Sequence, residues 1–169
     1  MLGSKKELVI VMINIMFVCW GNICRSPMAE FVLKDMTKKQ NIYHLFHIES
    51  SATSTEEIWN GVGNPVYPLA KKELAKHGIS CEGKRAVQLK KEDYGKYDLL
   101  IGMDNTNIRY MHRILGGDPE GKIKLFLEYA GMSRDVADPW YTGKFEVTYN
   151  DVVTGCEALL DYLRSEGRI

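Results

Sequence analysis

The stretch VCWGNICRSP, residues 18–27, holds a glycine and an asparagine between Cys19 and Cys24 and ends in Arg-Ser-Pro. The segment that leads into it, residues 13–18, is β-rich and almost entirely apolar, which predicts a strand buried on both faces. Ser26 and Pro27 form a helix start signal, with the serine as N-cap and the proline at the first helical position. The stretch therefore predicts a loop that joins the end of a buried strand to the start of a helix.

The rest of the chain repeats this alternation. Further strands are expected at residues 45–50, 97–104 and 122–127. Helices are expected from Pro68, over residues 105–115, and near the C-terminus, where apolar residues recur at helical spacing. Alternating strands and helices indicate a single α/β domain, a parallel sheet covered by helices on both faces. In such sheets, ligands bind at the carboxyl ends of the strands.

Length and composition limit the organisation and the partners. A chain of 169 residues with 45% hydrophobic and 26% charged residues is typical of one globular domain. The 22 acidic and 22 basic residues balance, so we expect no general attraction to nucleic acid or to a membrane surface. The apolar run at residues 8–20 is too short to span a bilayer. We expect an N-terminal extension or leader at residues 1–11 and one domain at residues 12–169.

The cysteine pair permits three interpretations: a metal site, a disulfide or an anion-binding loop. A metal site lacks ligands, because no second cluster of cysteine and histidine lies near the pair in the sequence. A chain able to bury a core of this size needs no disulfide framework, and we expect its four cysteines to be reduced in a cytoplasmic setting. The anion-binding loop accounts for more of the residues.

The residues of the loop suit a bound oxyanion. Backbone N–H groups at a helix N-terminus point toward such a ligand, and the helix dipole favours negative charge there. Gly21 permits backbone conformations closed to other residues, and Asn22 tolerates the left-handed region. Arg25 presents a planar fork that matches two oxygens of a phosphoryl group. The loop is therefore expected to cradle a phosphoryl group.

Cys19, at the base of the loop, is the candidate nucleophile. Helix amides, Arg25 and the Ser26 hydroxyl all favour a thiolate over a thiol. A thiolate aimed at a bound phosphoryl group is suited to covalent catalysis. The leaving group then needs a proton, and Asp138, in the segment ADPWYTG, is the candidate acid.

From Met12 onward, the sequence resembles the low-molecular-weight protein tyrosine phosphatases. FVCWGNICRSPMAE resembles the phosphate-binding loop of that family, and IESSATS, KHGI, MDNTNIR and DPWY match later landmarks in order. The resemblance implies a flavodoxin-like three-layer fold with a four-stranded parallel sheet of order 2-1-3-4. It also implies hydrolysis of phosphotyrosine through a phosphocysteine, with no metal and no cofactor. The expected partners are tyrosine-phosphorylated proteins, with inorganic phosphate or other oxyanions able to occupy the loop of a monomer.

The resemblance also assigns roles. Cys19 is implied as the nucleophile, Arg25 as the group that binds phosphate and stabilises the transition state, and Asp138 as general acid and then base. Asn22 is implied to hold the loop through Ser50. The implied substrate-binding residues of the loop are Trp20, Gly21, Asn22, Ile23, Cys24 and Ser26. Cys24 is also implied to form a reversible disulfide with Cys19 under oxidation, which would protect the nucleophile.

The sequence departs from the family near the expected pocket. Trp20 stands where relatives usually have an aliphatic residue, and residues 55–58 lengthen the next loop and add Glu56 and Glu57. Aromatic side chains are expected to line the substrate pocket: Trp20, Trp59, Trp140 and Tyr141. Because Trp140 replaces a tyrosine of many members, control by phosphorylation in this segment is expected at Tyr141 alone.

Three other functions stay open. Arsenate reduction on a similar loop relays a disulfide through two further cysteines, whereas Cys81 stands alone in the corresponding region. Phosphoarginine phosphatases tend to carry threonine where this chain has Ile23, and they lack the Trp140-Tyr141 pair. A phosphotyrosine-binding module would need neither a nucleophile nor an acid.

Overall fold

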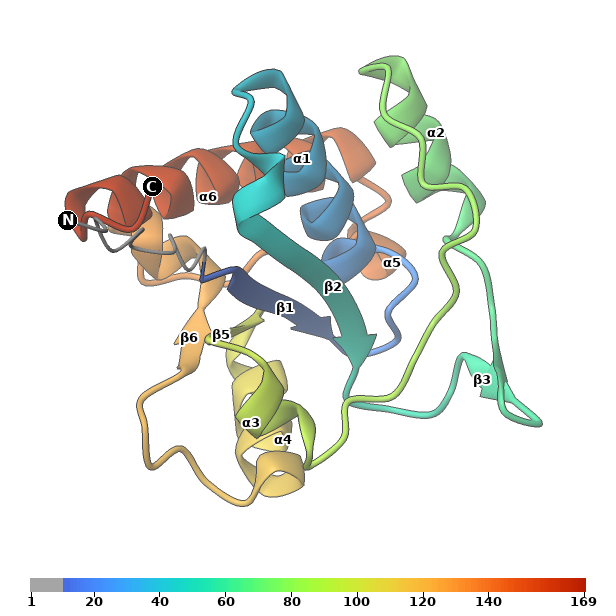
Figure 1. The fold of residues 1–169 in the computed structure, drawn as a ribbon. Coiled ribbons are helices and arrows are strands. Elements are labelled where there is room, and N and C mark those ends of the chain that lie inside the picture. Colours follow the sequence, from blue (N-terminus) through green and yellow to red (C-terminus); the bar gives the residue numbers. More distant parts are fainter. Residues whose placement is uncertain (1–10) are drawn as a thin grey trace, which may run out of the picture.

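The structure, a computed structural model, describes residues 11–169. Four strands form its main sheet, and all three pairings between them are parallel. The strands are β1 (Ile13–Cys19), β2 (Phe46–Ala52), β5 (Leu99–Gly102) and β6 (Ile123–Leu125). Their order is β2-β1-β5-β6, which is the expected order 2-1-3-4 of the four predicted strands (Figure 1). Except for Val11, the expected extension at residues 1–11 lies outside the described residues.

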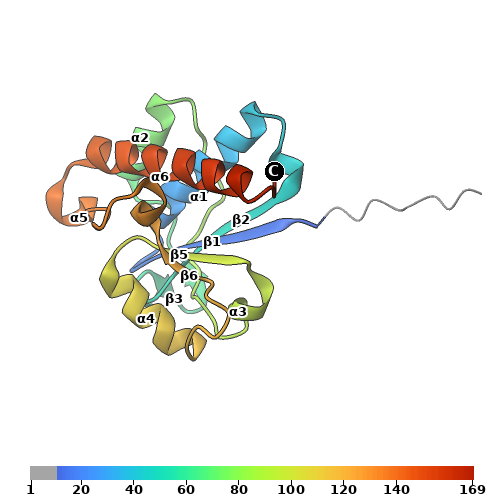
Figure 2. The same cartoon turned by 90° about the vertical axis from the view of Figure 1, so that its left-hand side faces the viewer.

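Helices cover both faces of the sheet (Figure 2). One face carries α1 (Arg25–Lys39), α2 (Pro68–Lys76) and α6 (Phe145–Ser165), and the other carries α3 (Asp93–Lys96) and α4 (Asn105–Leu115). Shorter helical turns complete the chain: η1 (Tyr43–Leu45), η2 (Phe126–Ala130) and α5 (Pro139–Thr142). The predicted α/β class with helices on both faces is confirmed.

The side chains of β1 divide between two hydrophobic cores. Ile15 and Phe17 pack into the larger core, with residues of α1, α2 and α6. Met16 and Val18 pack into the smaller core, with residues of α4. Successive side chains of a strand point to opposite faces, so an almost continuous apolar run is what a strand covered on both faces requires.

A small hairpin was not expected from the sequence. It pairs β3 (Ile58–Trp59) with β4 (Val62–Gly63) in antiparallel fashion. Asn60 (φ 49°) and Gly61 (φ 76°) make its turn, and both have the positive φ values that a two-residue hairpin needs. The dipeptide Asn-Gly is the strongest short hairpin signal in a sequence, so residues 60–61 are enough to predict a turn here.

Several predicted boundaries are wrong. The second strand runs from Phe46 to Ala52 and not over residues 45–50, and the third spans Leu99–Gly102 and not residues 97–104. The helix α1 begins at Arg25 with Cys24 as its N-cap, so Ser26 lies inside the first turn and is not the cap. The Ser26 hydroxyl lies 3.0 Å from the Cys19 Sγ atom and makes no capping hydrogen bond to the helix. The last strand ends at Leu125 and not at residue 127, because η2 begins at Phe126. Among residues 11–169, no helix is long and apolar enough to cross a membrane.

Candidate active site

A pocket opens where the carboxyl end of β1 meets the N-terminus of α1. Three segments line it: the loop after β1, the inserted loop after β2, and the segment that begins α5. The lining residues are Cys19, Trp20, Gly21, Ile23, Cys24, Arg25, Glu56, Glu57, Asp138, Trp140 and Tyr141. The structure therefore brings together the sequence-predicted nucleophile, arginine and acid, which are far apart along the chain.

Cys19 is 3% exposed and lies at the base of this pocket. Its Sγ atom accepts a hydrogen bond from the Asn22 N–H (3.3 Å) and lies 3.0 Å from the Ser26 Oγ atom. The Ser26 Oγ atom also accepts a hydrogen bond from the Asn22 side-chain amide (2.8 Å). Because Ser26 accepts there, its own hydrogen can point to the sulfur. Two hydrogen-bond donors are thus placed to converge on the sulfur atom.

Asn22 ties the loop to the neighbouring segments. Its φ is 59°, in the left-handed region that asparagine tolerates. Its side-chain N–H groups donate to Ser26 and to the Ser50 Oγ atom (2.9 Å), and its carbonyl oxygen accepts from the Val87 N–H (3.1 Å). The predicted link between Asn22 and Ser50 is confirmed. With all these bonds made in a side chain 1% exposed, the loop conformation is fixed before any ligand binds.

A buried charge network supports Ser50 from behind. Its hydroxyl donates to the Glu30 carboxylate (2.6 Å), and Lys84 donates to the Ser50 carbonyl oxygen (2.8 Å). Glu30 is 1% exposed, and its charge is balanced by Lys34 (2.7 Å) and Lys84 (3.4 Å). The sequence alone does not predict this network, because the contact between Glu30 and Lys84 joins segments that are far apart along the chain.

Arg25 reaches the pocket from the first turn of α1, with 3% of its surface exposed. Its Nη1 atom donates to the Asp104 carboxylate (2.7 Å) and to the Val136 carbonyl oxygen (2.9 Å). Its Nη2 atom lies 3.5 Å from the Asp138 carboxylate. Burial alone would lower the pKa of Arg25, but the negative charges of Cys19 and Asp104 outweigh it and raise that pKa. The guanidinium is thus held charged and oriented.

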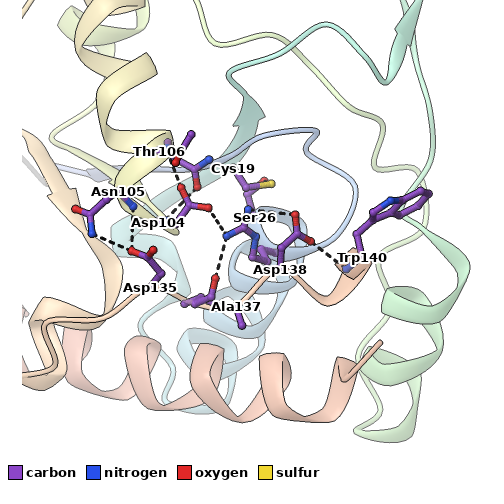
Figure 3. A network of polar contacts seen from close by, with 12 residues as sticks. Cys19, Ser26, Asp104, Asn105, Thr106, Asp135, Ala137, Asp138 and Trp140 are labelled. Carbon is purple, nitrogen blue, oxygen red and sulfur yellow. Dashed lines mark hydrogen bonds and ion pairs between the residues drawn. The ribbon is translucent and has the colours of Figure 1, made fainter. Parts of the chain in front are cut away.

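Asp104 is a residue of the site that the sequence did not predict. One carboxylate oxygen caps α4 by accepting from the Asn107 N–H (2.6 Å), and the other holds Arg25. Asp104 therefore stabilises a helix and orients Arg25 at the same time. Figure 3 shows Asp104 and Asp138 together beside Cys19 and Ser26.

Asp138 is the N-cap of α5 and accepts a hydrogen bond from the Trp140 N–H (3.0 Å) through Oδ1. Its other oxygen faces Arg25, and 27% of its side chain is exposed in the pocket. Proline at the first position of α5 has no N–H to satisfy, which suits this short cap. The carboxyl group is therefore fixed by its own helix turn while staying open to a leaving group.

Cys24 also lines the pocket, but its chemistry differs from that of Cys19. Burial raises the pKa of the Cys24 thiol, and the negative charges of Cys19 and Asp138 raise it further. It is free, as is Cys19. Cys24 is thus a neutral thiol beside the candidate nucleophile.

Aromatic side chains form the rim, with one exception. The Trp20 ring packs edge-on against Tyr110, with 5.3 Å between ring centroids, and Trp140 packs in the same way against Tyr67 at 4.9 Å. Trp59, expected to line the pocket, lies on β3 with 79% of its surface exposed and outside the lining. Its place in the lining is taken by Glu56 and Glu57 from the same loop. Within residues 11–169, no group of three or more potential metal ligands is present.

Comparisons with known proteins agree with this geometry. The family model for low molecular weight phosphotyrosine protein phosphatases matches residues 14–168. The chain belongs to this family. It is a hydrolase, as the resemblance implied. Among its relatives, the low molecular weight protein-tyrosine-phosphatase YfkJ of Bacillus subtilis is 36% identical, covering 94% of this chain and all of the relative.

Another relative and two solved structures show a similar sequence identity over nearly the whole chain. The Staphylococcus aureus (strain Newman) relative PtpA is 35% identical over 94% of this chain and 98% of its own. The crystal structure of YfkJ superposes with a TM-score of 0.86 over 92% of this chain and 96% of the other. That of SP-PTP from Streptococcus pyogenes gives 0.76 at 38% identity, over 91% and 93%. The phosphatase family and its fold therefore extend over nearly the whole chain.

Proposed function

We propose that this phosphatase hydrolyses phosphotyrosine monoesters of proteins through a phosphocysteine intermediate on Cys19. The observation that carries the proposal is the convergence of the Cys19 Sγ atom, the Arg25 guanidinium and the Asp138 carboxyl group on one pocket. Residues 12–169 are proposed to form the catalytic domain.

In the first step, backbone N–H groups of residues 20–25 and Arg25 bind the phosphoryl oxygens. The Cys19 thiolate attacks phosphorus, so that a P–S bond forms while the P–O bond to the tyrosine breaks. Asp138 gives its proton to the departing phenol oxygen. Positive charge held on Arg25 by Asp104 offsets the charge that develops on the phosphoryl oxygens.

In the second step, water replaces the phenol. Asp138, now a carboxylate, takes a proton from that water as its oxygen attacks the phosphocysteine. The P–S bond breaks, inorganic phosphate leaves, and Cys19 returns to its thiolate. Hydrogen bonds from Asn22 and Ser26 stabilise this leaving thiolate in the same way as they prepare it for attack.

The walls of the pocket support an aromatic substrate over the alternatives. Trp20, Trp140 and Tyr141 present flat apolar surface next to the nucleophile, which suits a phenyl ring better than the flexible chain of phosphoarginine. An arsenate-reducing relay would need two further cysteines, whereas Cys24 is the one other cysteine among the described lining residues and Cys81 is buried outside the lining. A binding module would have no use for Asp138 as a proton donor.

The proposed chemistry requires a reduced Cys19, and this requirement limits the compartment in which the enzyme can act. We propose a cytoplasmic location, because a reducing compartment keeps Cys19 active. We further propose that the enzyme acts as a monomer.

A disulfide between Cys19 and Cys24 stays a prediction. Mass spectrometry after mild peroxide is expected to find that link, and overoxidised Cys19 with no link would contradict it.

A substrate panel tests the proposal. The reduced protein is given a tyrosine-phosphorylated peptide, a phosphoarginine peptide, and arsenate with a thiol reductant. We expect rapid phosphate release from the first and little turnover of the other two. The Cys19→Ser variant should release no phosphate from either peptide and should not reduce arsenate. Preference for phosphoarginine, or arsenate reduction alone, would overturn the proposed substrate.

A further inference from the structure

The mouth of the pocket carries more negative than positive charge. Glu56, Glu57 and Asp138 line it with carboxylates, and Arg25 is the only cation among its described lining residues. Arg25 is already engaged by Asp104 and Asp138. A phosphotyrosine dianion therefore has to pass two glutamates whose charge nothing in this lining neutralises.

Glu56 is held in place on one side of the mouth. Its Oε2 atom accepts a hydrogen bond from the Trp20 indole N–H (2.9 Å). The loop that carries it is tied to the same residue, because the Ser54 N–H and hydroxyl both donate to the Trp20 carbonyl oxygen (3.0 and 2.8 Å). Among residues 11–169, no cation lies within ion-pair distance of Glu56.

Glu57 is fixed in a similar way, directly over the loop. Its Oε2 atom accepts from the Asn64 side-chain amide (2.7 Å), and a Cβ atom at Gly21 would lie 3.2 Å from its Cγ atom. In the described part of the chain, it too has no cationic partner. Each glutamate thus uses one oxygen to hold its position and keeps the other oxygen and the charge for a ligand.

The balance of charges decides which substrates suit this mouth. Carboxylates at the entrance repel the phosphate dianion and repel acidic residues next to it. A lysine or arginine beside the phosphotyrosine reverses the sign of that interaction while the phosphate still binds the loop amides and Arg25. Both glutamates stand in the segment that lengthens this loop, residues 55–58.

We propose that Glu56 and Glu57 form an acidic subsite that binds a lysine or arginine side chain next to the phosphotyrosine of a protein substrate. The inference rests on the proposed function, since it names the sequence context that the same pocket selects. The subsite determines specificity and takes no part in the bond-breaking steps.

The test compares matched phosphotyrosine peptides that differ at one neighbouring position, which is lysine, glutamine or glutamate, on either side of the phosphotyrosine. For the wild-type enzyme we expect kcat/KM to favour lysine over glutamate by about tenfold at low salt on at least one side. The preference should shrink in high salt, because the charges are partly exposed. Para-nitrophenyl phosphate, which has no neighbouring residue, reports the chemistry alone.

Two variants assign the preference to these residues. Glu56→Gln and Glu57→Gln each keep an oxygen that can accept from Trp20 or Asn64 but remove the charge. The double variant is expected to lose most of the lysine preference, measured as the ratio of kcat/KM values. Glu157→Gln, on an exposed position of α6 outside the pocket, is the matched control and should keep the wild-type ratio.

The outcomes separate the two proposals. If para-nitrophenyl phosphate and the peptides are not hydrolysed at all, the proposed function fails and the subsite falls with it. If they are hydrolysed without a lysine preference, the subsite is wrong while the function stands. A lysine preference that survives in the double variant would likewise overturn the assignment to Glu56 and Glu57.

Discussion

Asp138, the proposed proton donor, is held in a fixed position by two contacts. The Trp140 N–H holds one oxygen, and the other lies toward Arg25 and the pocket. General acid catalysis matters most when the leaving group is basic, because a poor leaving group cannot depart as an anion. The substrate dependence of a variant can therefore separate an acid from a residue that merely shapes the pocket.

Asp138→Asn is expected to lower kcat for phenyl phosphate by about 10²–10⁴-fold, the usual contribution of a positioned acid. The loss should be much smaller for para-nitrophenyl phosphate, since nitrophenolate leaves without a proton. Steady-state kinetics with both esters measures the difference. Equal losses for the two esters would show that Asp138 does not act as the acid.

Asp104 links Arg25, the proposed phosphate-binding residue, to the cap of α4. In Asp104→Asn, the asparagine can still cap α4, but the ion pair to Arg25 is lost. We expect kcat/KM for para-nitrophenyl phosphate to fall by about tenfold or more, with little change in the free energy of unfolding.

The control for Asp104 is Asp161→Asn, which removes an exposed carboxylate of α6 whose one ion pair among residues 11–169 is with Arg164. It should leave kcat/KM unchanged. An Asp104→Asn enzyme with wild-type kcat/KM would mean that the Val136 carbonyl oxygen alone orients Arg25.

Among the elements, the hairpin β3–β4 supports the active site indirectly. The loop before it lines the pocket, and the hairpin itself does not. Gly63 in β4 packs directly on the backbone of Ala86, where an added Cβ atom would lie 1.8 Å from the carbonyl oxygen. The next residue, Val87, donates its N–H to the Asn22 side chain. The hairpin therefore supports the segment that holds Asn22 and, through it, the loop after β1.

Gly63→Ala should force these two segments apart, because backbone atoms cannot yield as a flexible side chain can. We expect a loss of about 1–3 kcal/mol in the free energy of unfolding, together with lower kcat/KM. Urea unfolding and kinetics measure the two effects. Gly95→Ala, in α3 with nothing within 4 Å of the added atom, should be neutral or slightly stabilising. Equal behaviour of the two variants would contradict this account.

The sequence predicted elements well where local patterns determine them. The strand at residues 13–18, the order of the four strands and the left-handed Asn22 follow from apolar runs, family resemblance and loop chemistry. What it missed depends on contacts between distant segments: Glu30 with Lys84, and Arg25 with Asp104. The N-cap of α1 was missed for a local reason: the Ser26 hydroxyl contacts Cys19 within the same loop, and Cys24 is the N-cap.

For the whole molecule, buried cysteine and tyrosine side chains control how the free energy of unfolding changes at high pH. Burial raises the pKa of Tyr97 to about 12, and it also raises the pKa values of Cys24, Tyr129 and Cys156. In the unfolded chain these groups ionise near their ordinary values, roughly pH 8.5–10. Above that range the unfolded state has lost protons that the folded state keeps, so the stabilisation present at lower pH is lost as the pH rises.

The free energy of unfolding from urea titrations should therefore fall steadily between about pH 9 and about pH 11. Cys156→Ala removes one fully buried thiol from α6, and its free energy of unfolding should fall less steeply over the same range. A flat pH profile for the wild-type protein, or an equally steep fall in Cys156→Ala, would contradict this explanation.

The central claim is that Cys19 carries the phosphoryl group during turnover. Rapid-quench measurement with para-nitrophenyl phosphate tests it most directly, by comparing the wild-type enzyme with Cys19→Ser in the first turnover. The account predicts a burst of nitrophenol equal to the enzyme concentration, with the phosphoryl group trapped on Cys19 and no burst in the variant. Turnover by Cys19→Ser at the wild-type rate, or wild-type turnover in which no phosphoryl group can be trapped on Cys19, would contradict it.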